Sequence, residues 1–180
     1  MEAKHITFDL ETLGNTTTAP IIQIGAVKFS EDGEIHDTFL RSISFNSLQK
    51  AGFQMDFETV KWWMEQDKAV IDSVIMNKDR VSITEALNAY RNWIHKPYDY
   101  EYWSHATFDA PIVFHAQRVL GLSGIIMPYK QQRDIRTLTR FSGKVKANEH
   151  GLIYHNALDD CKRQAEYISK AIRIVKGLSD

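Results

Sequence analysis

The 180-residue sequence predicts an α/β sandwich built on a mixed β-sheet. Three strand-like segments lie in the first quarter of the chain, at residues 6–12, 22–29 and 35–43. After them, segments with helical spacing of apolar residues alternate with shorter strand-like segments, and this order indicates helices packed against a mixed sheet. The length fits a single domain over residues 1–180 with a sizeable buried core.

Each expected element rests on a local pattern. Turn residues Glu31-Asp32-Gly33 join the strands at 22–29 and 35–43, which predicts an antiparallel meander with the first strand. Helices are expected at 56–65, 84–94 (with Ser82 or Thr84 as N-cap), 110–120 and 134–141, strands at 98–104 and 125–127, and a polar loop at 144–151. The last helix is the clearest, because one apolar stripe contains Ala157, Leu158, Cys161, Ala165, Ile168, Ile172 and Val175.

Composition is ordinary for a soluble globular protein, with 43% apolar and 25% charged residues and a formal charge of −1. No run approaches the roughly 18 apolar residues of a membrane helix, and no signal peptide is visible. The single cysteine, Cys161, cannot form an internal disulfide, which suits a cytoplasmic protein. Positive charge gathers between Lys130 and Lys146, where six basic residues accompany only Asp134. This segment is either a phosphate-facing stripe or a solvated surface.

Two acids on the first strand, Asp9 and Glu11, point to the same side of the sheet. Ile6, Phe8 and Leu10 alternate with them, so the apolar side chains can face a core while the carboxylates emerge about 7 Å apart on the other side. Like charges this close repel unless a cation lies between them, and hard divalent cations bind such oxygens. An exposed strand end can also carry two acids without a metal, so the pair alone leaves both interpretations open.

Three further polar residues lie where helices are expected to begin. Asp109 follows a predicted strand and precedes a helix, where it can be an N-cap, a ligand-binding carboxylate, or both. His155 comes just before the last helix, in a segment too polar for core burial. Asp159 and Asp160 lie in the first turns of that helix, where the helix dipole favours acids. This explains Asp159, whereas Asp160 flanks the apolar stripe and can point toward Asp9.

Together these motifs resemble the DEDDh exonucleases, a family with a ribonuclease H-like fold. The resemblance rests on Asp9-x-Glu11, on Phe108-Asp109 and on His155 five residues before Asp160, and it spans nearly the whole chain. Segments 59–66 and 132–137 are similar to a subgroup that contains phage exonuclease A and mycobacterial adenylate-RNA exonuclease. One departure is His105, which stands where many members of the family have asparagine.

The resemblance implies a ribonuclease H-like three-layer sandwich with a mixed five- or six-stranded sheet. It also implies that Asp9, Glu11, Asp109 and Asp160 ligate two Mg²⁺ or Mn²⁺ ions and that His155 is the general base. The expected activity is 3′-5′ exonucleolytic release of nucleoside 5′-monophosphates from nucleic acid with a free 3′ end, either single-stranded or as a 3′ overhang. The segment 132–137 favours DNA as the substrate over RNA, and the cytoplasm of a bacterium or a phage-infected host is the expected location. The alternatives are an endonuclease of the same fold and a catalytically silent nucleic-acid-binding module.

Eight residues are candidates for substrate contact: Thr12, Leu13, Trp62, Trp63, His105, Phe108, Arg133 and Arg136. Adjacent helical positions point about 100° apart, so one of Trp62 and Trp63 is expected in the core while the other can stack on a base. Exposed aromatics here could instead form the interface of a homodimer. Arg133 and Arg136, three residues apart, are expected on one helix face, where they either bind phosphate or pair with an acid. His105 either contacts substrate or packs.

Overall fold

The computed structural model describes residues 2–124, 126–143, 145–147 and 151–178. A six-stranded mixed sheet runs in the order β4-β3-β2-β1-β5-β6. The strands are β1 His5–Thr12, β2 Ile21–Phe29, β3 Ile35–Ile43, β4 Arg80–Val81, β5 Glu101–Ser104 and β6 Gln132–Asp134. Strands β1, β2 and β3 pair antiparallel, whereas the β3–β4, β1–β5 and β5–β6 pairs are parallel. The predicted α/β fold and antiparallel meander are confirmed.

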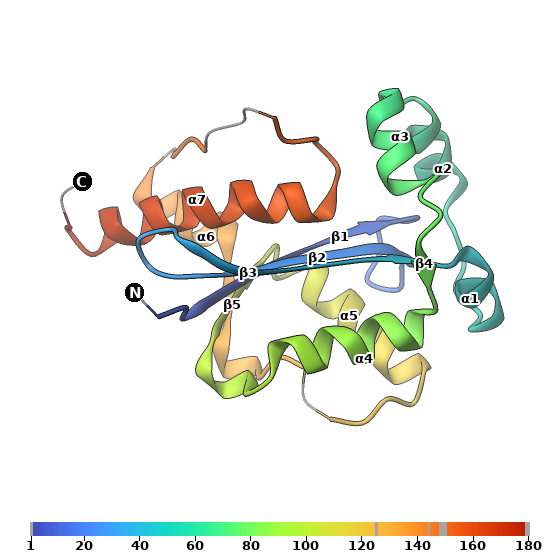
Figure 1. Ribbon diagram of the computed structural model, residues 1–180, viewed down its shortest axis with the longest axis horizontal. Coiled ribbons are helices and arrows are strands. Elements are labelled where there is room, and N and C mark those ends of the chain that lie inside the picture. Colours follow the sequence, from blue (N-terminus) through green and yellow to red (C-terminus); the bar gives the residue numbers. More distant parts are fainter. Residues whose placement is uncertain (1, 125, 144, 148–150, 179–180) are drawn as a thin grey trace.

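Helices cover both faces of the sheet, giving three layers (Figure 1). The long helix α7 (Ala157–Val175) and the short α6 (Ile135–Ser142) pack on one face, and α4 (Ile83–Ile94) and α5 (Asp109–Val119) lie on the other. Three short helices, α1 (Phe45–Lys50), α2 (Phe57–Met64) and α3 (Lys68–Val74), lie at the end of the sheet where β1 finishes (Figure 1). Among the helices of the described ranges, none combines the length and apolarity needed to cross a membrane.

Alternation along β1 separates the core from the polar face of the sheet. Ile6, Phe8 and Leu10 are buried in the larger apolar core, against α4 and α5. Residues Thr7, Asp9 and Glu11 therefore face α7, and the Thr7 hydroxyl donates a hydrogen bond of 2.6 Å to Gln164 on that helix. On the same side, Cys161, Ala165, Ile168 and Ile172 form the smaller core with residues of β2, β5 and α6.

The first turn of α7 lies directly on the sheet because β2 has a glycine beneath it. A Cβ atom on Gly25 would lie 2.3 Å from the carbonyl carbon of Ala157, closer than non-bonded atoms can approach. Gly25 is also the register partner of Asp9 on β1. Gln23, two residues before Gly25, accepts a hydrogen bond of 2.9 Å from the Ala157 amide, and the Asn156 side chain caps the helix. These contacts place the start of α7 beside Asp9.

Two predicted strands need correction. The strand expected at 98–104 covers only Glu101–Ser104, because Pro97 begins a 3₁₀ turn over Pro97–Asp99. No strand forms at 126–127, where Ile126 and Met127 are buried in the core without pairing to a strand. Residue 125 lies outside the described residues, as do 144 and 148–150 of the predicted polar loop. Strand β5 pairs with β1 on one side and with β6 on the other.

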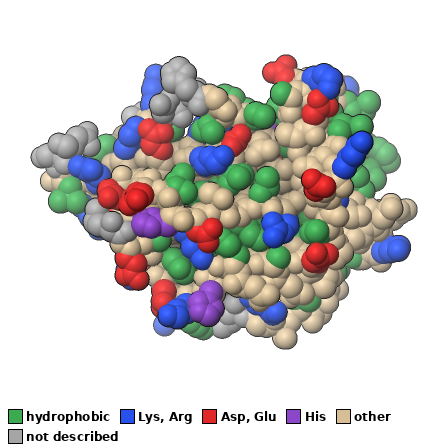
Figure 2. All heavy atoms as spheres, in the orientation of Figure 1, with side chains coloured by type: hydrophobic (Ala, Val, Ile, Leu, Met, Phe, Trp, Pro, Cys, Tyr) green, Lys and Arg blue, Asp and Glu red, His purple; other side chains and the backbone are tan. Residues whose placement is uncertain are grey.

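The other expected helices are present with small shifts of their ends, and Ser82 is the N-cap of α4. Helices α1 and α3 and strand β4 have no counterpart in the expected elements. The face drawn in Figure 2 shows acidic and basic side chains interspersed. This agrees with the formal charge of −1.

Candidate functional site

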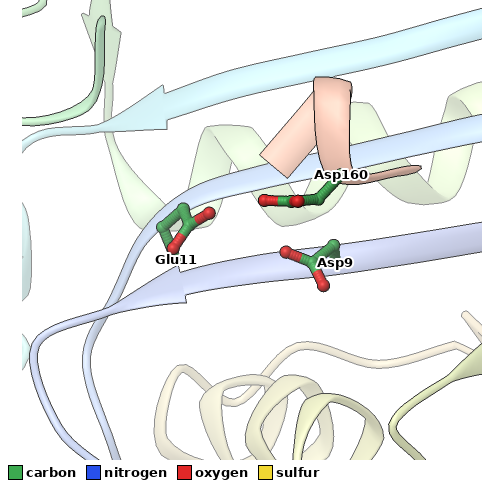
Figure 3. A group of neighbouring side chains, drawn as sticks. All are labelled: Asp9, Glu11 and Asp160. Carbon is green, nitrogen blue, oxygen red and sulfur yellow. The ribbon is translucent and has the colours of Figure 1, made fainter. Parts of the chain in front are cut away.

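Three carboxylates converge where β1 ends and α7 begins (Figure 3). Asp9, Glu11 and Asp160 each offer one oxygen, and these three oxygens lie within 4.8 Å of one another. Asp9 and Glu11 come from β1 and Asp160 from the first turn of α7, so the predicted meeting of strand and helix acids is present. Carboxylate oxygens this close can share a divalent cation.

Two residues of α7 hold the acids in place. Gln164 accepts from Thr7 through its carbonyl oxygen and donates a hydrogen bond of 2.9 Å to Oδ1 of Asp9. Arg163 forms an ion pair with Oδ1 of Asp160 through Nη2. Both residues are nearly fully buried although they are polar. The positions of the acids are therefore set by hydrogen bonds as well as by the backbone.

Asp109 lines the same cleft as the three acids, a cavity of about 390 Å³. It is the first residue of α5 rather than its N-cap, which is Phe108. Its Oδ2 accepts a hydrogen bond of 2.9 Å from the backbone amide of His105, so the carboxylate stabilises the turn that precedes its own helix. Asp109 is 2% exposed and does not belong to the group of three oxygens within 4.8 Å.

His155 lines the cleft from the loop before α7. Its backbone is left-handed, with φ of 56°, a conformation that few non-glycine residues adopt. The imidazole packs edge-on against Trp62, with 4.8 Å between ring centroids. Trp63 is buried as predicted for one of the two tryptophans, and its indole nitrogen donates to the carbonyl oxygen of Thr12 at 2.9 Å.

The electrostatics of the cleft favour a bound cation. Burial raises the pKa of Asp9 to about 6, although the hydrogen bond from Gln164 and the charge of Arg163 act in the opposite direction. Burial and the neighbouring Asp9 charge raise the pKa values of Glu11 and Asp109 well above the ordinary range. Ionising all of these acids without a counter-charge is unfavourable, so the residues present fit a site for divalent cations.

The pKa values of the two histidines in the cleft are lowered, whereas those of the acids are raised. Burial, and then the charge of Arg163, lower the pKa of His155 below its ordinary value. Burial and Arg136 lower the pKa of His105, whose Nδ1 is buried without a hydrogen-bond partner among the described residues. Both imidazoles are therefore neutral near pH 7, the form that can accept a proton.

The other predicted contact residues fall in different places. Phe108, His105 and Arg136 line the cleft. Leu13 lines a separate groove of about 860 Å³ beside α1, α2 and α3, and every side chain along that groove is uncharged. Thr12 is buried, with its hydroxyl donating to the Gly14 carbonyl at 2.7 Å.

The expectation that Arg133 and Arg136 share a helix face is wrong. Arg133 lies in β6 and pairs with Glu101 at 2.6 Å, whereas Arg136 lies in α6. The short strand pairs with β5, which makes the predicted helix begin at residue 135 instead of 134 and separates the two arginines.

Sequence reasoning did not identify Arg163, Gln164 or Tyr167 as part of the cleft. Arg163 and Gln164 follow Asp160 by three and four residues, so they share its helix face. The sequence feature that could have identified them is the polar character of positions 163 and 164, which lie beside the apolar stripe of α7.

Comparison with protein families gives a match along most of the chain. Residues 4–172 match the family described as the 3′-5′ exoribonuclease Rv2179c-like domain. An exodeoxyribonuclease of Enterobacteria phage T4 is 23% identical over an alignment that covers 96% of this chain and 90% of that protein.

Solved structures with similar folds include two exonuclease I proteins and S. pombe Pop2p. Exonuclease I from Methylocaldum szegediense superposes with a TM-score of 0.64 at 10% identity, over 98% of this chain and 41% of that one. The zinc-bound E. coli ExoI–ssDNA complex gives a TM-score of 0.62 at 9% identity, over 98% and 43%. S. pombe Pop2p, in a form with Mg²⁺ and Mn²⁺, gives 0.59 at 12% identity, over 95% and 83%. The chain spans about two fifths of the exonuclease I chains, and these likenesses show a shared ribonuclease H-like fold.

Proposed function

Because the chain belongs to the 3′-5′ exoribonuclease Rv2179c-like domain family and is thus a 3′-5′ exonuclease, we propose that it removes nucleoside 5′-monophosphates from a free 3′ end with two divalent cations and a histidine base. The observation that carries the proposal is the convergence of Asp9, Glu11 and Asp160 within 4.8 Å, in a cleft that also contains Asp109 and His155. An endonuclease or a silent binding module has no comparable support.

Asp9, Glu11, Asp109 and Asp160 would hold two Mg²⁺ or Mn²⁺ ions. When bound, such ions lower the pKa of water and stabilise the charge that develops on the phosphate and on the leaving oxygen. The raised pKa values of Asp9, Glu11 and Asp109 fit this role, because a cation supplies the counter-charge that these acids lack. Pop2p with Mg²⁺ and Mn²⁺ is a precedent for the choice of ions.

His155 would accept the proton of the attacking water. Its lowered pKa leaves the imidazole neutral near pH 7, and its place in the cleft puts it near the acids. The ring contact with Trp62 restricts where the imidazole can point. Trp62 is 39% exposed, so its ring can also stack on a base of the substrate.

The substrate would be a single strand or a 3′ overhang, and the E. coli ExoI–ssDNA complex is a precedent for single-strand binding by a protein of this fold. Arg136 is an exposed cation on the cleft and would contact a phosphate. The names of the relatives point in two directions, because the family is described as exoribonucleases and the phage T4 protein as an exodeoxyribonuclease. DNA and RNA are thus two candidate substrates for the same chemistry.

The test is a matched panel of single-stranded, duplex and 3′-overhang DNA and RNA, labelled at either end, with Mg²⁺ and with chelator. We expect mononucleotides from 3′-labelled strands and a ladder of shortening products from 5′-labelled ones, both abolished by chelator. Internal fragments from the start of the reaction would indicate an endonuclease. Binding without any product would indicate a silent module, and the relative rates would decide between DNA and RNA.

A further inference from the structure

Arg163 is a buried cation inside the cleft that the proposed chemistry does not use. Its side chain is 8% exposed, on the same face of α7 as Asp160. Burying a guanidinium costs free energy unless it is paired with another group. The groups that contact Arg163 therefore indicate its role.

The guanidinium contacts two parts of the site at once. Nη2 pairs with Oδ1 of Asp160. The Cζ atom lies 4.1 Å from the centre of the Tyr154 ring, a cation–π contact. Tyr154 is the residue before His155, whose backbone is left-handed. Arg163 therefore connects a carboxylate of the acid cluster to the segment that carries the histidine.

The adjacent cation of α7 forms a different ion pair. The neighbouring Lys162 pairs with Asp159 at 2.8 Å, and Asp159 in turn accepts from the amide of Ile153. Nη1 of Arg163 is buried without an acceptor in the described chain, so the guanidinium is held mainly by Asp160 and Tyr154.

We propose that Arg163 is a positioning residue that fixes the Asp160 carboxylate and the His155 loop in one arrangement before cations and substrate bind. The inference rests on the proposed function, because that function gives Asp160 and His155 their roles. One oxygen of Asp160 is occupied by the guanidinium, which orients the carboxylate and leaves the other oxygen for a cation. Hydrogen bonds to ligating carboxylates typically orient them in this way.

The test compares Arg163→Gln with Lys162→Gln. Lys162→Gln is a matched control. It removes one positive charge and one i,i+3 ion pair from the same helical turn, but that ion pair is with Asp159, so the contacts of Asp160 and Tyr154 with Arg163 remain. Arg163→Lys keeps the positive charge. It replaces Arg163→Gln as the test variant if circular dichroism shows that the glutamine variant is unfolded.

The first measurement is Mn²⁺ binding without substrate, followed by electron paramagnetic resonance of the free ion. We expect Arg163→Gln to bind Mn²⁺ about 10–100-fold more weakly than the wild type. Lys162→Gln should match the wild type, and Arg163→Lys should recover part of the loss because an ammonium can still pair with Asp160.

The second measurement is the fluorescence of Trp62, taken as the difference between each protein and its Trp62→Phe counterpart. Since His155 packs against Trp62 at 4.8 Å, release of the loop should change this emission in Arg163→Gln and leave it unchanged in Lys162→Gln.

Unchanged Mn²⁺ affinity or an unchanged Trp62 signal in a folded Arg163→Gln would overturn the proposal. So would tighter Mn²⁺ binding, because Arg163 would then compete with cations instead of orienting their ligand. Failure of the wild type to bind Mn²⁺ or to shorten 3′ ends would count against the two-cation function. The Trp62 fluorescence requires neither bound metal nor activity. It therefore still tests whether Arg163 positions the loop that carries His155.

Discussion

Asp9 is ionised at neutral pH at a cost, because burial raises the pKa of its carboxyl to about 6. Asp9→Asn removes the charge and keeps the shape of the side chain. The variant should therefore raise the stability of the metal-free protein by about 1–2 kcal/mol, after allowance for partial exposure. It should also abolish turnover. Thermal unfolding and a 3′-end assay measure the two effects, and wild-type turnover in this variant would refute the metal role of Asp9.

His155→Ala should lower turnover by about 10²–10⁴-fold while substrate affinity is retained, because a positioned base is lost. In the wild type the lowered pKa of His155 means that activity should fall, as imidazolium forms, at a lower pH than the ordinary histidine pKa would give. The pH profile is measured at saturating Mg²⁺, so that protonation of the acids does not dominate it. A variant that keeps the acid limb of the wild type would show that another group is the base.

Arg136 and Arg133 form a matched pair for testing phosphate contact. Arg136→Ala should weaken binding to single strands and reduce the slope of log affinity against log salt by about 0.7. Arg133→Ala should leave that slope unchanged, because this arginine pairs with Glu101 instead of lining the cleft. Fluorescence anisotropy with chelator present measures both. A slope for Arg136→Ala equal to that of the wild type would show that Arg136 does not contact phosphate.

At the scale of elements, the contact between β2 and α7 determines where Asp160 lies. Gly25→Ala would place a Cβ atom 2.3 Å from backbone atoms of Ala157, so the helix start must move. We expect a loss of about 1–3 kcal/mol in stability, as for other overpacked sites, together with weaker Mn²⁺ binding. Gly14→Ala is the comparison for stability, since its nearest neighbour is a side-chain atom at 3.2 Å. Similar melting temperatures for both variants would show that the contact is not tight.

Elements with a strong local pattern could be predicted, and with them part of the site. Alternation along β1 placed Asp9 and Glu11 on one face, and the apolar stripe of α7 placed Asp160 toward that face. Helices α1 and α3 and strand β4 are too short to leave such a pattern. The separation of Arg133 from Arg136 depends on pairing between β5 and β6, and the contacts of Arg163 depend on tertiary packing. Neither is encoded in the spacing of neighbouring residues.

For the whole molecule, the proposed metal binding by the acid cluster would depend on pH together with stability. Because the folded-state pKa of Asp9 is raised from 3.8 to about 6, its contribution to stability is present below pH 3.8 and is lost as pH rises through about 6. Under the proposed function, Mg²⁺ would bind the ionised acids of the folded state and not the unfolded chain. The rise in melting temperature with Mg²⁺ should therefore be small near about pH 5 and larger near about pH 7.5. At a Mg²⁺ concentration a hundredfold above Kd, the free energy of unfolding should increase by about 2.7 kcal/mol.

Differential scanning fluorimetry at both pH values measures this rise in melting temperature. Asp9→Asn is the control, and its melting temperature should change little with Mg²⁺ at either pH. A shift with Mg²⁺ that does not depend on pH would indicate that the ion binds elsewhere.

The sequence positions of the acids also have a consequence for biosynthesis. Asp9 and Glu11 lie on β1 and leave the ribosome well before Asp160, which belongs to α7. Under the proposed mechanism, a nascent chain without α7 has three of the four acids and no complete set of ligands. On that mechanism, nuclease activity would begin only after synthesis has passed Asp160 and α7 has packed over Gly25. The unfinished chain would then be unable to degrade the nucleic acid that surrounds it during translation.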